Sequence, residues 1–89
     1  MNAIRTVRVK DLAKDPLTGE AIALAPSELQ ACACCAKLCT KVHVLSTGHE
    51  VGHECASVLE QLAAHGGDAE WARVLRASKK QRAFLEAIS

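Results

Sequence analysis

Two cysteines set three positions apart, Cys32 and Cys35, place the strongest constraint on how this chain can fold. This spacing lets a tight turn of the backbone point both sulfur atoms at one metal ion, as zinc knuckles do. Cys55 follows at the expected start of a helix, where the free amides of the first turn favour a thiolate. The sequence therefore predicts a zinc site with these three cysteines as ligands.

The size and composition of the chain indicate why a metal would be needed. A domain of 89 residues hides roughly 60% of the surface of its unfolded chain, which leaves a thin margin of stability. Hydrophobic residues make up 49% of the chain but aromatic residues only 2%, so a core of alanine, valine and leucine buries modest area per residue. A bound zinc ion would supply the missing stabilisation.

The fourth zinc ligand is left open by the spacing. A second ligand on the helix would stand three residues before or after Cys55, but those positions hold Gly52 and Val58, which cannot bind a metal. His53 lies in the loop that turns into the helix, where a neutral imidazole would complete a tetrahedral site. We favour His53 over Cys39. The other candidates within reach are His49, which ranks third, and His43.

The N-terminal part of the chain is expected to form a β-hairpin. Polar and apolar residues alternate from Thr6 to Lys10, which predicts a half-buried strand with Val7 and Val9 facing inward. Proline and glycine in residues 15–19 indicate a turn, and residues 20–24 are the expected return strand.

A further strand at residues 41–45 and two helices are expected after the hairpin. Apolar residues at helical spacing predict a first helix from residue 52 that ends at His65-Gly66-Gly67, and its buried face holds Cys55, Val58, Leu59 and Leu62. Asp68 is the expected N-cap of a second helix. Because its apolar stripe fails at residues 78–82, we expect this helix to extend beyond the body of the domain.

These elements predict a small α+β domain stabilised by zinc. It consists of a β-hairpin in residues 1–26, a zinc-ribbon-like module in residues 27–66 and a basic C-terminal helix in residues 67–89.

The middle of the chain, roughly residues 32–62, resembles the small zinc-ribbon domains of treble-clef type in bacterial and phage proteins. The sequence CACCAKL at 32–38 is similar to their C-x-x-C-G-K/R pattern, and GHECA at 52–56 is similar to the G-x-x-C-A that opens their helix. Ala36 stands where glycine is usual, and Cys34 and Cys39 are additional. The resemblance implies a structural zinc module of a mobile element, and an adaptor or inhibitor of host nucleic-acid machinery is the role it suggests.

We expect this protein to be no enzyme and to have no small-molecule substrate. Cys32 and Cys35 could form a redox pair, but redox pairs of this spacing precede a long helix, and none is expected after Cys35. Zinc deaminases carry a His-x-Glu before a Pro-Cys-x-x-Cys, whereas here His53-Glu54 follows the cysteine pair.

A protein is the partner we favour. The protruding C-terminal helix ends in an apolar patch of Phe84, Leu85 and Ile88, which would dock on another protein or on a second copy of this chain. The net charge of +1 gives no overall attraction to nucleic acid.

Nucleic acid is the alternative partner, because five basic side chains fall within ten residues of the C-terminal helix. They are Arg73, Arg76, Lys79, Lys80 and Arg82, and a continuous helix would place Arg73, Arg76 and Lys80 on one face.

The sequence also predicts a cytoplasmic protein without a membrane partner. Its uncharged stretches are far shorter than the ~20 residues of a membrane helix. The first residues lack the apolar run of a secretory signal.

Overall fold

A computed structural model describes residues 4–88 and shows a small α+β fold. Its strands are β1 (Thr6–Asp11), β2 (Gln30–Ala31), β3 (Leu38–Cys39), β4 (Lys41–Leu45) and β5 (Glu50–Val51). Its helices are α1 (His53–Ala64), α2 (Ala69–Val74) and α3 (Lys79–Ile88), with a short 3-10 turn, η1, at Pro26–Glu28. The α+β class predicted from the sequence is confirmed.

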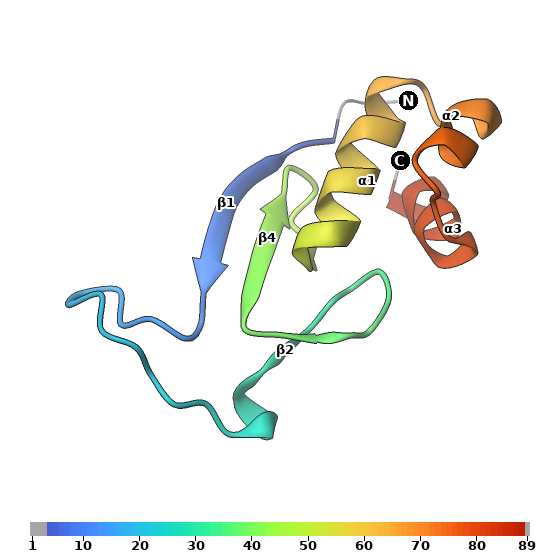
Figure 1. Cartoon of the computed structure of the whole chain (residues 1–89). Coiled ribbons are helices and arrows are strands. Elements are labelled where there is room, and N and C mark those ends of the chain that lie inside the picture. The colour runs from blue at the N-terminus through green and yellow to red at the C-terminus, as the bar shows by residue number, and fades with distance from the viewer. Residues whose placement is uncertain (1–3, 89) are drawn as a thin grey trace.

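β4 is the central strand of a three-stranded antiparallel sheet with the order β1-β4-β5. Its side chains Val42 and Leu45 are fully buried, as the apolar pattern of this strand predicts. β1 lies along β4 with Val9 opposite His43 (Figure 1). The strand predicted at residues 41–45 is therefore confirmed, and it organises the sheet.

The prediction of an N-terminal hairpin is wrong about the partner of the first strand. β1 pairs with β4 rather than with residues 20–24, and one isolated bridge, Lys14 to Ala21, joins the two sides of the intervening loop. Val7 and Val9, expected to face inward, are 56% and 44% exposed. Alternation of residues identifies a strand but not its partner. β4 places Val42 and Leu45 in the core, whereas residues 20–24 form no strand and are mostly exposed.

The helix predicted from residue 52 is confirmed as α1, which supplies most of the core. Cys55, Leu59 and Leu62 recur on its buried face and pack with the sheet. Gly66 and Gly67 adopt positive φ angles directly after the helix, which is the conformation that ends helices.

The second predicted helix is broken into α2 and α3. Asp68 is the N-cap of α2, as predicted, and its side chain accepts a hydrogen bond from the amide of Glu70. Arg76 adopts a φ of 55° after α2, and the chain then turns into α3. Ser78 and Gln81 form reciprocal side-chain to backbone bonds that start this new helix.

α3 returns to the domain instead of extending away from it. It lies against α1, and Leu85 is only 2% exposed (Figure 1). Phe84 and Ile88 are half-buried and pack against the same core. The predicted exposure of Leu85 in the docking patch is therefore wrong, because α3 buries this side chain against α1, while Phe84 and Ile88 stay partly exposed.

Candidate metal centre

The first two thiols of the predicted zinc site stand on a tight knuckle between β2 and β3. The two strands pair through Gln30 with Cys39 and Ala31 with Leu38. The amide of Ala36 donates to the carbonyl of Cys32 at 2.8 Å, and Ala36 has a φ of 64°. The left-handed region favours glycine, so the chain turns here in spite of a methyl side chain.

The third thiol belongs to the first turn of α1. Gly52 is the N-cap of the helix, and Cys55 is buried beneath it. β5 leads directly into this turn. The backbone carbonyl of Glu50 in β5 accepts a 3.0 Å hydrogen bond from the amide of Ala33 in the knuckle. The knuckle and the helix therefore meet at one point, although they are distant in the sequence.

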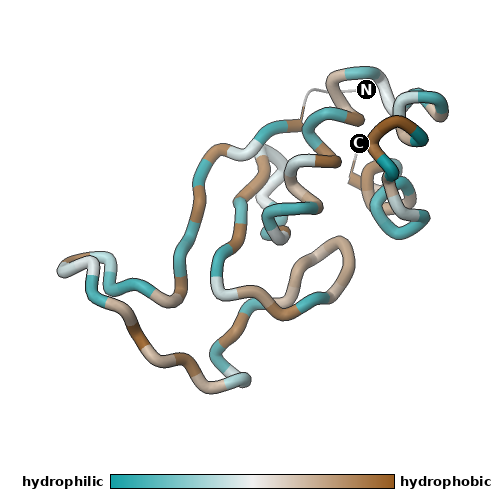
Figure 2. The backbone as a smooth tube through the Cα atoms, viewed as in Figure 1, coloured by the Kyte–Doolittle hydropathy of each residue, from teal (hydrophilic) through white to brown (hydrophobic). Residues whose placement is uncertain are grey.

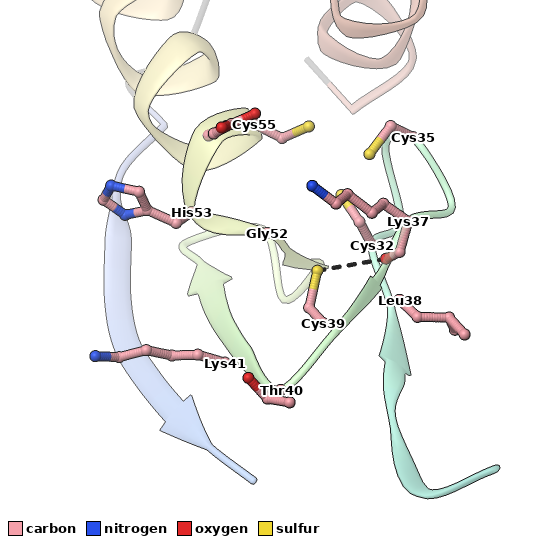
Figure 3. Close-up of a pocket in the computed structure, with 11 residues that line it drawn as sticks. Cys32, Cys35, Lys37, Leu38, Cys39, Thr40, Lys41, Gly52, His53 and Cys55 are labelled. Atoms are coloured by element: carbon pink, nitrogen blue, oxygen red, sulfur yellow. Dashed lines mark hydrogen bonds between the residues drawn. The ribbon is translucent and has the colours of Figure 1, made fainter. Parts of the chain in front are cut away.

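The sulfur atoms of Cys32, Cys35 and Cys55 all lie within 4.8 Å of one another. Figure 3 shows the knuckle presenting its sulfurs toward the helix start. Three thiols in this arrangement could hold a metal ion, since thiolates are the ligands that zinc and other soft metals prefer. The structure thus brings together all three of the ligands predicted from spacing.

The electrostatic surroundings of the three thiols differ. Burial raises the pKa of Cys55, and the thiols of Cys35 and Cys32 raise it further, although the Gln81 amide opposes this. Burial would also raise the pKa of Cys32, but the backbone amides of Gly52, Cys35 and Cys34 donate to its sulfur and bring the pKa below its ordinary value. The amides around Cys32 therefore favour the thiolate that a metal requires.

His53, the preferred candidate for the fourth ligand, lies apart from the three thiols. Its side chain is exposed, and its Nδ1 lies 3.4 Å from Nε2 of His43. Figure 3 shows the ring turned toward β1 and away from the cysteines. His49 is engaged elsewhere too, with its Nδ1 2.7 Å from the Thr47 hydroxyl and its ring against Phe84.

Two further cysteines border the cluster. Cys39 lines the same cavity of about 390 Å³ as the three thiols, and it donates a 3.3 Å hydrogen bond to the carbonyl of Lys37. Cys34 is half-buried inside the knuckle, where its thiol forms a hydrogen bond with that of Cys55. The described part of the chain contains no disulfide among its five cysteines.

No protein-family model matches this chain, and no curated protein sequence or solved structure is significantly similar to it. The zinc-ribbon resemblance therefore remains a prediction. In residues 4–88, no helix is long and apolar enough to cross a bilayer.

The basic side chains predicted to contact nucleic acid are all exposed, but they do not share one helix. Arg73 lies in α2 and Arg76 in the connection, whereas Lys79, Lys80 and Arg82 lie in α3. The expected stripe of Arg73, Arg76 and Lys80 on one helical face is wrong, because the left-handed residue at position 76 breaks the helix between them.

Gln81 is a contact of the metal centre that the sequence analysis missed. Its side-chain amide nitrogen lies 3.6 Å from the sulfur of Cys55, so α3 reaches the thiol cluster. The signal that could have located α3 is the pair Ser78 and Gln81, which has the spacing of a capping box. The contact itself depends on α3 folding back onto α1.

Proposed function

We propose that this chain is a non-enzymatic interaction module whose fold is held by a structural zinc ion and which docks on a protein partner. The three-thiol cluster carries the first part of the proposal. It joins the knuckle to the N-terminus of α1, two segments whose other connections are short strands of two residues each. A metal at this point would stabilise a fold whose core is small.

Zinc is the metal we propose because the donors are thiols held in a tight knuckle and at a helix start. Sulfur ligands select zinc or other soft metals over magnesium and calcium, which prefer oxygen. Structural zinc sites are rich in cysteine, whereas catalytic sites hold the ion mostly through histidine and carboxylate. The cluster of thiols therefore favours a structural role over a reaction.

The N-terminal arm, defined as β1 and the loop of residues 12–25, is the surface we propose for the partner. Its exposed apolar side chains include Val7, Val9, Leu17 and Ile22. Figure 2 shows hydrophobic stretches along this arm, on the side of the molecule away from α2 and α3. β1 is an edge strand, so its outer backbone groups are open to pairing with an added strand.

An acidic extended segment of another protein fits this edge best. Arg5, Arg8 and Lys14 are exposed along the arm. The carboxylates of Asp11 and Asp15 each accept a hydrogen bond from a backbone amide two residues on and keep their charge, and Glu20 is a third acid in the loop, so the positive charge is concentrated at the β1 end of the arm. A second copy of β1 would bring Arg8 close to the basic side chains of its equivalent strand, and like charges across a strand pair are destabilising.

The docking proposal can be tested with two synthetic peptides of alternating valine and charged residues, one with glutamate and one with lysine. We expect the glutamate peptide to shift the NMR amide signals of residues 5–11, and the lysine peptide to leave them unchanged. The double variant V7D/V9D should lose the response. Equal shifts with both peptides, or shifts confined to α2 and α3, would refute docking at β1, and a concentration-dependent dimer would indicate a second copy instead.

Nucleic acid remains a second candidate because the five basic side chains of α2, α3 and their connection are exposed. In residues 4–88, the ion pair of the structure joins Lys10 to Glu50 and uses none of these five. Binding through five phosphate contacts would weaken by about 10²- to 10³-fold between 50 and 200 mM salt. Fluorescence anisotropy with a labelled random-sequence duplex, on the wild type and on R76A/K80A, measures this effect. Salt-insensitive or absent binding would exclude the nucleic-acid candidate.

A further inference from the structure

We infer that Cys39 is the fourth ligand of the metal centre and that Gly52 is the residue that makes room for its sulfur. The inference rests on the proposed metal centre and names the group that closes it. It assigns four thiols, Cys32, Cys35, Cys39 and Cys55, to one ion.

Gly52 stands where a second ligand on the helix would be expected, three residues before Cys55. It is buried at the N-cap of α1, and its φ of −68° is open to any residue. A Cβ atom built at this position would lie 3.1 Å from the sulfur of Cys39. The thiol of Cys39 therefore occupies the space that a ligand side chain at position 52 would fill.

Cys39 also lies close to the knuckle thiols. Its side chain lines the same cavity as Cys32, Cys35 and Cys55, although its sulfur lies outside the group of three that are all within 4.8 Å of one another, so it would move toward them when a metal binds. Gly52 itself donates its amide to the sulfur of Cys32. The backbone amide of Gly52 thus contacts the predicted ligand Cys32. The absence of a side chain at Gly52 leaves room for the sulfur of Cys39.

The hydrogen bond of the Cys39 thiol is one that metal binding would release. The thiol donates to the carbonyl of Lys37, and a thiolate has no proton to donate. Deprotonation therefore frees the sulfur from this carbonyl, and its proton leaves to solvent. Lys37 lines the same cavity and lies near the cysteines (Figure 3), and its positive charge favours the net negative charge of an ion bound by four thiolates.

The other candidates have different partners. His53 lies beside His43, and His49 lies beside Thr47. The thiol of Cys34 forms a hydrogen bond with Cys55, but Cys34 is not among the residues that line the cavity shared by the other four cysteines. His53 also lines the cavity, but its ring is directed to His43; among the described cysteines outside the three-thiol cluster, Cys39 is therefore the one that lines the cavity.

Cobalt(II) provides the test, because it replaces zinc in thiolate sites and its charge-transfer absorption grows with the number of bound thiolates. We expect C39S to retain one cobalt ion per chain with about one quarter less charge-transfer absorption than the wild type. C34S is the matched control and should keep the full intensity, as should H53A. The double variant G52C/C39A should regain it, because the new sulfur enters the space vacated by the old one.

The outcomes separate this inference from the proposed metal centre. A wild type that takes up no cobalt would refute the metal centre itself. A wild type that binds cobalt while C39S keeps full intensity, or G52C/C39A fails to exceed C39S, would overturn the role of Cys39 alone. A loss of intensity in C34S, with none in C39S, would transfer the role to Cys34. A change of the visible ligand-field bands in H53A, with full charge-transfer intensity in C39S, would transfer it to His53.

Discussion

Ala36 holds the most costly backbone conformation of the metal centre. Its φ of 64° lies in the left-handed region, where a side chain that carries Cβ costs about 1–2 kcal/mol relative to the right-handed region. The turn of the knuckle requires this conformation, since the amide of Ala36 closes onto Cys32. The site therefore keeps its geometry in spite of the residue at this position.

Replacing Ala36 with glycine should stabilise the protein by about 1 kcal/mol, because glycine adopts the left-handed region without this cost. Urea denaturation of the zinc-loaded protein measures the change in the free energy of unfolding. A33G in the same knuckle is the control and should destabilise, since Ala33 has no positive φ to relieve. Equal effects of the two substitutions would contradict the explanation.

His43 should make the stability depend on pH. Partial burial lowers the pKa of its imidazole below the ordinary value of 6.5, and the neighbouring His53 and Lys41 lower it further, against the opposing Glu60. The folded state therefore favours the neutral ring. As the pH falls below 6.5, the unfolded chain takes up a proton first and stability decreases, until the pH passes the folded pKa.

As the pH falls just below 6.5, the free energy of unfolding of the variant H43Q should decrease less than that of the wild type. The measurement is urea denaturation at a series of pH values with zinc held constant in both proteins. Protonation of the metal-binding thiols affects both alike, so the difference between the two profiles isolates His43. Parallel profiles would show that His43 titrates alike in the folded and unfolded states.

At the scale of elements, α3 is a part of the core rather than a free arm. Its capping pair Ser78 and Gln81 starts the helix, and Leu85 fills the space beside α1.

Leu85→Ala should lower the free energy of unfolding by about 2–5 kcal/mol, as large-to-small changes in cores do. Leu17→Ala is the control, because Leu17 is 93% exposed, and should change the stability by less than about 0.5 kcal/mol. A small effect of Leu85→Ala would mean that α3 is detached in solution.

At the scale of the whole molecule, the thiol cluster connects parts that have few other contacts. The knuckle is held by two strands of two residues each, and it meets α1 and α3 at the thiol cluster. Structural zinc contributes about 10–16 kcal/mol to the folding of small zinc-finger peptides at neutral pH. Loss of the ion should therefore open the knuckle and weaken its contact with both helices.

Removal of zinc with a chelator should lower the thermal midpoint and expose the thiols together. We expect a thiol reagent to modify about one cysteine per chain in the zinc-loaded protein, Cys34, and all five after chelation. Restoring zinc under reducing conditions should reverse both changes. Thiol reactivity that is the same with and without chelator would contradict a structural metal.

Local patterns in the sequence were sufficient for the elements whose energetics are local. The spacing of Cys32 and Cys35, the apolar face of α1 and the cap at Asp68 each depend on residues a few positions apart. The helix face and the cap are confirmed, and the two cysteines lie in one cluster with Cys55, while zinc in this cluster stays a prediction. Helix caps and knuckle turns are local in this sense because their hydrogen bonds close within one turn of chain.

Only the tertiary structure decided which distant segments meet. The partner of β1, the return of Leu85 to the core and the position of the Cys39 sulfur against Gly52 all join segments far apart in the chain. Such contacts are selected by the apolar area that the whole chain can bury, and alternation or helical spacing carries no information about the partner. The cysteines therefore predicted a thiol cluster, while the packing of strand against strand and helix against helix determined which of them meet in it.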